Sequence, residues 1–203
     1  MGRPRVHEIE VESMRRLRAR RDLSHLPPLT RAVTERIVHS AADFRYADEL
    51  AMDEAALAGA WDALESGAPI VADSRMVAAG VTSTEVYVPL AEPEVPALAE
   101  EWGTTRSAAA VRLAAAKAGP GAVWVVGNAP TALEAVLVHA EAPALVVGLP
   151  VGFVGAVESK AALRESGLPA VSNTSELGGS AVAAGCVNAL LYIDRSHKEG
   201  AHQ

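Results

Sequence analysis

GAVWVVGNAPTALEAVLVHAEAPALVVGLP, residues 121–150, contains the pattern from which the architecture of the chain follows. Its two short valine-rich runs, Val123–Val126 and 145–149, are typical of strands buried on both faces of a sheet. Between them, residues 129–139 follow a small, polar turn and have the length and composition of a helix. This strand, helix, strand order predicts two parallel strands joined by a right-handed crossover.

The same pattern continues on both sides of this segment. Apolar runs at 70–73 and 170–173 predict two further parallel strands, and a run at 86–90 predicts a fifth, which Pro89 places at an edge of the sheet. Helices are predicted around these strands at 96–101, 105–118, 129–139, 159–166 and 179–192. The alternation predicts an α/β fold, a three-layer α/β/α sandwich with a mostly parallel central sheet.

The N-terminal third of the chain has a different pattern. Three helices are predicted at 8–21, 29–44 and 53–65, with Pro27 and Pro28 separating the first two. The chain is therefore expected to form a single domain over 1–203, with a helical N-terminal part at about 8–66 and an α/β part at about 68–193. The polar tail 194–203 is expected to be frayed.

Composition excludes several classes of protein. The net charge of −7 argues against a nucleic-acid-binding protein, because phosphate neutralisation needs a basic face. Cys186 is the single cysteine, which excludes an internal disulfide, and no spacing of cysteine and histidine indicates a metal site. Uncharged stretches are too short to span a membrane, and no secretory signal follows the basic N-terminus. These features predict a cytoplasmic protein.

The turns that follow the predicted strands predict a binding cleft. Ligands of open α/β sheets collect at the carboxyl ends of the strands, where helix N-termini present unpaired N–H groups. The turns at 73–75, 127–131, 148–155 and 173–180 are rich in Gly, Asn and Ser. Any one of them reads as an ordinary turn or cap, but four on one edge favour a cleft. Neither a dinucleotide fingerprint nor a phosphate-binding loop occurs.

His39 is the histidine whose spacing allows chemistry. It lies off the main apolar stripe of its predicted helix, and Glu35 and Asp43 stand four residues before and after it. A carboxylate one helical turn away, Asp43 being the candidate, would fix the imidazole tautomer and leave the other nitrogen to transfer a proton. The competing interpretation, an exposed ion pair, is favoured by spacing alone.

Two basic residues at predicted helix starts remain ambiguous from the sequence. Arg106 opens the helix at 105–118, where a cation opposes the helix dipole, so either an anionic partner or solvent surrounds it. Lys160 follows Glu158-Ser159 at another helix start and has the same two interpretations. Cys186 lies in a run of small residues and is expected to be buried, in the core or at a subunit interface.

Seven strings of residues, taken in order, resemble the precorrin-8X methylmutase family of corrin biosynthesis, including its cobalt-precorrin-8 branch. They are Ile9-Glu10-x-x-Ser13, Arg36-Ile-Val-His39-Ser-Ala-Ala-Asp43-Phe44, Ala72-Asp73-x-x-Met76-Val77-x-x-Gly80, Thr105-Arg106-Ser107-Ala108-Ala109, Gly127-Asn-Ala-Pro-Thr-Ala-Leu133, Gly148-x-Pro-Val-Gly-Phe-Val-Gly-Ala-x-Glu-Ser-Lys160, and Gly178-Gly-Ser180 with Asn188-Ala-Leu190. Each string is weak alone, but the ordered set is specific.

The resemblance implies an isomerase that moves a methyl group from ring carbon 11 to ring carbon 12 of precorrin-8X or cobalt-precorrin-8, giving hydrogenobyrinate or cobyrinate. It implies no cofactor, no resident metal, and a homodimer with a cleft shared between subunits. His39 matches the catalytic histidine, the acid that protonates the macrocycle. The residues it implies for substrate binding are Ser13, Arg106, Asn128, Thr131, Gly178, Gly179 and Ser180.

One departure from the family pattern keeps a second function open. Many members have a basic residue just before the Gly-Gly-Ser turn, whereas this chain has Glu176. The alternative is a catalytically silent corrinoid-binding or carrier protein, against which the retained His39, Ser13 and Arg106 argue. A generic nucleotide-binding domain is disfavoured by the missing phosphate motifs. The string after His39 leans toward the cobalt branch without deciding it.

Overall fold

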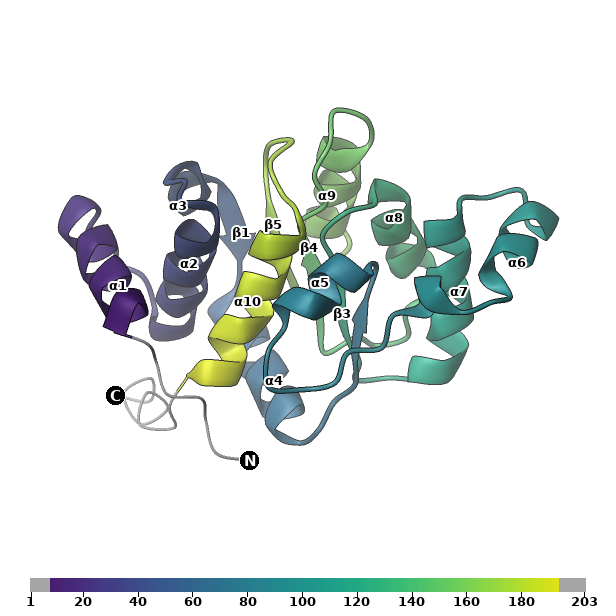
Figure 1. Cartoon of the computed structure of the whole chain (residues 1–203), viewed down its shortest axis with the longest axis horizontal. Coiled ribbons are helices and arrows are strands. Elements are labelled where there is room, and N and C mark those ends of the chain that lie inside the picture. Colours follow the sequence, from purple (N-terminus) through teal and green to yellow (C-terminus); the bar gives the residue numbers. More distant parts are fainter. Residues whose placement is uncertain (1–7, 194–203) are drawn as a thin grey trace.

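A five-stranded sheet forms the centre of the computed structural model, which describes residues 8–193 (Figure 1). The predicted tail 194–203 lies outside the described residues. The strand order is β1-β5-β4-β3-β2, and the last four are mutually parallel. These four are the predicted strands: β2 (Ile70–Ala72), β3 (Val123–Val126), β4 (Leu145–Gly148) and β5 (Ala170–Asn173).

The fifth strand was predicted in the wrong place. The edge strand is β1 (Leu50–Met52), which pairs antiparallel with β5 and lies in the part of the chain predicted to be helical. The segment 86–90 contributes only an isolated bridge between Tyr87 and Val71, and Pro89–Ala91 turns into a 3₁₀ helix. Pro89 lacks the N–H that would continue the ladder, so the pairing ends after Tyr87.

Helices cover both faces of the sheet and make the predicted three layers. One face is covered by α2 (Pro28–Ala41), α3 (Arg45–Glu49), α4 (Glu54–Glu65), α5 (Arg75–Gly80) and α10 (Ser180–Tyr192). The other is covered by α7 (Arg106–Ala118), α8 (Pro130–His139) and α9 (Ala156–Glu165). Helix α1 (Glu8–Arg20) packs outside α2, and α6 (Val95–Glu101) packs beside α7. The short helices α3 and α5 were not predicted. Helix α9 begins three residues before its predicted start at 159.

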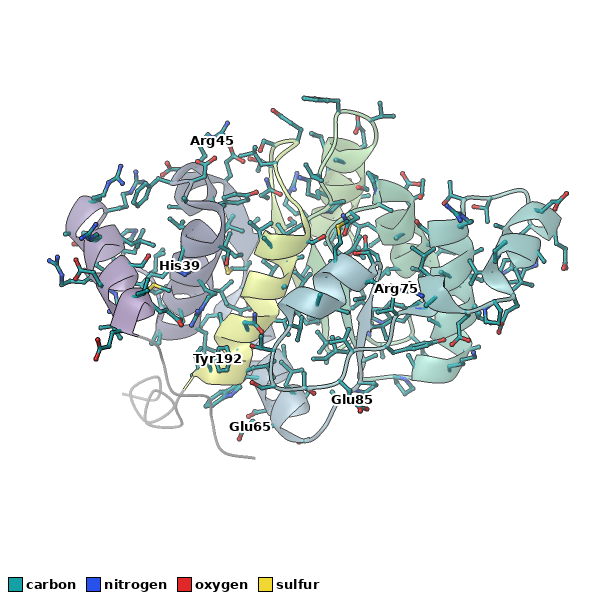
Figure 2. The ribbon with its side chains drawn as sticks, viewed as in Figure 1. His39, Arg45, Glu65, Arg75, Glu85 and Tyr192 are labelled. Atoms are coloured by element: carbon teal, nitrogen blue, oxygen red, sulfur yellow. The ribbon has the colours of Figure 1, made fainter. Side chains whose placement is uncertain are left out.

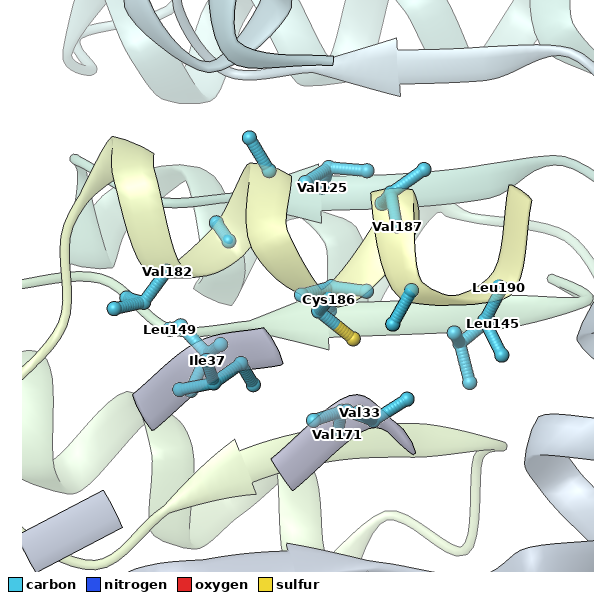
Figure 3. Close-up of a cluster of buried hydrophobic side chains, with 14 of the residues drawn as sticks. Val33, Ile37, Val125, Leu145, Leu149, Val171, Val182, Cys186, Val187 and Leu190 are labelled. Atoms are coloured by element: carbon cyan, nitrogen blue, oxygen red, sulfur yellow. The ribbon is translucent and has the colours of Figure 1, made fainter. Parts of the chain in front are cut away.

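The core between α2, α10 and the sheet is a cluster of buried apolar side chains (Figure 3). Val33 and Ile37 of α2 and Cys186 of α10 are fully buried there. A Cβ on Gly185 would lie 2.7 Å from Ser40 Oγ, so glycine lets α2 and α10 approach closely. Cys186 is thus a core residue, and burial raises the pKa of its thiol to about 12. Among residues 8–193, no helix is long and apolar enough to cross a bilayer.

Candidate functional site

The four turns at 73–75, 127–131, 148–155 and 173–180 meet at one end of the sheet, which we call the carboxyl edge. Asp73 joins the first two of these turns. Its carboxylate accepts hydrogen bonds from the backbone N–H groups of Gly127 (3.2 Å), Asn128 (2.7 Å) and Ala129 (2.9 Å). Burial raises the pKa of Asp73 above its ordinary value, against the lowering effect of these N–H groups. The carboxylate therefore organises the turn between β3 and α8.

The other two turns are joined to each other. The N–H of Gly179 donates to the carbonyl of Leu149 (2.9 Å), and the N–H of Gly152 donates to the carbonyl of Glu176 (3.2 Å). A Cβ on Gly178 would collide with the backbone oxygens of Leu149 and Pro150, so only glycine allows this approach. The predicted convergence of the turns is confirmed.

Side chains from three turns then meet at the Asn128 carboxamide. The hydroxyls of Ser74 and Ser180 each donate to Asn128 Oδ1 at 2.7 Å. Nearby, Thr131 Oγ1 and Thr105 Oγ1 share a hydrogen bond of 2.8 Å. The predicted residues Asn128, Thr131 and Ser180 therefore lie together, but the Ser180 hydroxyl hydrogen is already used inside the protein. Ser74, although it lies in the predicted turn 73–75, and Thr105 were not predicted as site residues. The contacts with Asn128 and Thr131 form only in the folded chain.

Lys160 is neither solvated nor free for an anionic partner, so both sequence interpretations are wrong. Its side chain is fully buried, and Nζ donates to Asn173 Oδ1 (2.8 Å), to the carbonyl of Leu177 (2.7 Å) and to the carbonyl of Ser175. Desolvation, with the neighbouring Arg164, lowers the pKa of Lys160 to about 8. By donating to these three oxygens, the ammonium group stabilises the loop that precedes Gly178 and Gly179.

His39 and Ser13 form a second cluster, between α1 and α2 (Figure 2). Ser13 Oγ lies 2.8 Å from His39 Nδ1, so helix α1 supplies the hydrogen-bond partner of the imidazole. The two residues line a pocket of about 210 Å³, which we call the α1/α2 pocket. Its other lining residues are Arg16, Leu17, Arg20, Val38, Ala42 and Phe44.

The carboxylates expected beside His39 have other partners. Helix α2 ends at Ala41, and Asp43 lies beyond it with its carboxylate bound to Arg45. That guanidinium holds the pKa of Asp43 below its ordinary value. Glu35 is buried and accepts two hydrogen bonds from Arg18. Ser13 is the partner that the structure gives to His39, a contact that helical spacing within α2 does not encode.

Within one chain, the α1/α2 pocket and the carboxyl edge are separate. His39 lies on the α1 side of α10, whereas α5 and α7 lie on the other side (Figure 2). Arg106 is exposed at the start of α7, and none of the predicted residues of the carboxyl edge lines the α1/α2 pocket. Glu176 is exposed, and its charge acts on two cations, Arg45 and Lys160.

The described part of the chain has no group of three His, Cys, Asp or Glu side chains that could hold a metal ion. The α1/α2 pocket combines an imidazole, which can transfer a proton, with the side chains of Arg16 and Arg20, the first of which is paired with Glu12. At the carboxyl edge, the NH₂ group of Asn128 is a neutral donor that an anionic group could use.

Comparison with known proteins agrees with the resemblance seen in the sequence. A family model described as precorrin-8X methylmutase (CbiC) matches residues 8–193. The chain belongs to the precorrin-8X methylmutase family. This family assignment makes the protein an enzyme, an isomerase of cobalamin biosynthesis, as the ordered motifs predicted.

Relatives from both branches of the family match most of the chain. The cobalt-precorrin-8 methylmutase of Salmonella typhimurium is 42% identical over 180 residues, covering 85% of this chain and 86% of that protein. The precorrin-8X methylmutase of a Sinorhizobium species is 41% identical over 186 residues, covering 86% and 88%. The solved structure of a precorrin-8X methylmutase from Thermus thermophilus has a TM-score of 0.83 and 35% identity, covering 96% and 100%.

Proposed function

We propose that this protein moves the methyl group from carbon 11 to carbon 12 of precorrin-8X or cobalt-precorrin-8, with His39 as the acid that protonates the macrocycle and with no external cofactor. The observation that carries this assignment is the contact of 2.8 Å between Ser13 Oγ and His39 Nδ1. When Ser13 Oγ accepts from Nδ1–H, the tautomer is fixed and Nε2 is the nitrogen that gives and regains the proton. A sigmatropic shift needs little more than a strained, correctly protonated substrate.

Two features of the α1/α2 pocket support an acidic tetrapyrrole as the substrate. Arg16 and Arg20 line it together with the apolar side chains of Leu17, Val38 and Phe44. An apolar wall suits the conjugated ring, and guanidinium groups bind carboxylates in bidentate pairs. The negative net charge of the protein is thereby reconciled with an anionic substrate.

The test is an anaerobic absorbance time course of the purified protein with precorrin-8X and, separately, with cobalt-precorrin-8. Formation of hydrogenobyrinate or cobyrinate supports the proposal, and the faster substrate identifies the branch. A bound-corrinoid spectrum without conversion of either substrate would instead establish the carrier function.

We also propose that two copies of the chain share each active site, in a cytoplasmic homodimer. Drug-sized ligands occupy pockets of about 300–1,000 Å³, and a tetrapyrrole with its side arms is larger still. The α1/α2 pocket, at about 210 Å³, holds only part of such a substrate. The carboxyl edge of a second copy would supply the remaining contacts, including Arg106.

Mixing two inactive variants tests the shared site. His39→Ala and Arg106→Ala dimers are combined, dissociated and reassociated, so that half of the dimers are mixed. If sites are shared, each mixed dimer has one intact site, and activity returns to about a quarter of the wild-type value. If each chain works alone, mixing restores nothing, and a monomer in sedimentation would also overturn the proposal.

A further inference from the structure

Ser74 has both of its hydrogen-bonding roles filled by two different neighbours. As the N-cap of α5, its Oγ accepts from the backbone N–H of Val77 at 3.2 Å. Its hydroxyl donates to Asn128 Oδ1 at 2.7 Å, and the Asp73 carboxylate is a second acceptor beside it. The side chain is buried, so these partners satisfy it in place of water. The N-terminus of helix α5 therefore orients the Ser74 hydroxyl, and the hydroxyl in turn orients the Asn128 carboxamide.

Ser180 completes the arrangement from the opposite side of the turn. Its hydroxyl donates to the same oxygen, also at 2.7 Å, so both lone pairs of Asn128 Oδ1 are used. Within residues 8–193, no hydrogen bond engages Asn128 Nδ2. Turning the carboxamide over would place its NH₂ group against the two hydroxyls, which would then have to accept, and their hydrogens would lose Oδ1 as acceptor. The two N–H donors are consequently held away from the serines.

The backbone beneath Asn128 is fixed as well. Asp73 accepts from the N–H groups of Gly127, Asn128 and Ala129, so the turn has no spare backbone donors on that side. Gly127 is closed in by Val77, Ala183 and the Cα of Ser180, which prevents the turn from moving toward the core. Side chain and backbone together give Asn128 one orientation before any ligand binds.

We propose that Ser74 is a positioning residue for substrate, which holds the Asn128 carboxamide so that its NH₂ group donates to a carboxylate arm of the tetrapyrrole. The inference rests on the proposed function in assigning Asn128 to substrate binding. A carboxylate accepts through two oxygens, and a carboxamide NH₂ of fixed orientation meets it without loss of rotational freedom. Ser74 itself does not touch the substrate, so it acts on binding and not on the methyl shift.

Steady-state kinetics with three substitutions at position 74 tests this role. Ser74→Ala and Ser74→Gly both lack the hydroxyl and are expected to raise KM, and the Kd for the corrinoid product, about tenfold with little change in kcat. Ser74→Thr retains the hydroxyl and should restore wild-type KM. Since glycine is a far better N-cap than alanine, a purely structural role would make Ser74→Ala clearly worse than Ser74→Gly.

Asn128→Ala is the matched comparison. It should raise KM to the same extent, and adding Ser74→Ala to it should cause no further rise, because the serine acts through the amide. If Asn128→Ala raises KM but Ser74→Gly does not, the positioning role is wrong while the proposed function stands. If neither changes KM or product Kd, the assignment of Asn128 to substrate fails and the inference with it. Additive effects of the two substitutions would also overturn it.

Discussion

The buried ammonium of Lys160 predicts an unusual dependence of stability on pH. The pKa of Lys160 is lowered to about 8 in the folded chain, against 10.5 for the free side chain. Below pH 8 both states are protonated, and above about pH 10.5 both are neutral. Between these limits the unfolded chain binds more protons, so the free energy of unfolding rises with pH, by at most about 1.4 kcal/mol per pH unit.

The magnitude follows from the groups around Nζ. Desolvation and Arg164 lower its pKa, while Glu49 and Glu176 raise it, and the net effect is that half of the folded chains have lost this proton near pH 8. From pH 7 to pH 9 this titration should add about 1 kcal/mol to the free energy of unfolding. Other groups also titrate in this range, including Cys186, so the lysine contribution is isolated as a difference between wild type and variant.

The assay is urea unfolding of wild type and Lys160→Met at pH 7 and pH 9. At pH 7 the variant should be less stable by about 2 kcal/mol, because the oxygens of Asn173, Ser175 and Leu177 lose their donor. At pH 9 the gap should widen by about 1 kcal/mol. Lys160→Gln, which keeps an amide donor, serves if the methionine variant does not fold, and exposed Lys117→Met should show no widening. A gap that is constant or narrows with pH would refute the reasoning.

Further substitutions address the carboxyl edge. Gly178→Ala should destabilise the fold by about 1–3 kcal/mol, because its methyl group meets the backbone oxygens of Leu149 and Pro150. Gly59→Ala, in open space on α4, should stabilise by about 0.5–1 kcal/mol, so equal effects of the two in thermal unfolding would contradict the packing argument. Asp73→Asn should cost about 2 kcal/mol and weaken product binding, because the amide NH₂ then faces a backbone N–H. Unchanged urea unfolding of Asp73→Asn would count against that role.

The sheet was largely predictable because its strands carry their own signal. Buried parallel strands are continuous apolar runs, so Val123–Val126 and its three neighbours stand out between turns. Edge strand β1 carries no such signal: Leu50–Met52 is only half-buried, short, and placed between two helices. Its pairing with β5 depends on residues 119 to 123 positions away along the chain, which the local sequence pattern does not reveal.

The sequence predicted where the turns of the candidate site lie, but it did not predict which side chains contact one another. Turns rich in glycine and serine located the carboxyl edge, and the hydrogen bonds of Asp73 and Asn128 show why those turns meet. The partner of His39 could not be read from helical spacing, since Ser13 comes from another helix and Asp43 lies past the end of α2. Lys160 failed as a prediction because burial against three oxygens is a property of the folded loop.

The central claim is that His39 protonates the macrocycle during the methyl shift. The most direct measurement is a single-turnover absorbance experiment with excess enzyme under anaerobic conditions, comparing wild type with His39→Ala, beside a titration of both with the corrinoid product. The account predicts conversion by the wild type, loss of conversion by at least a hundredfold in the variant, and product Kd values that agree within a few fold. Conversion by His39→Ala at the wild-type rate would contradict it.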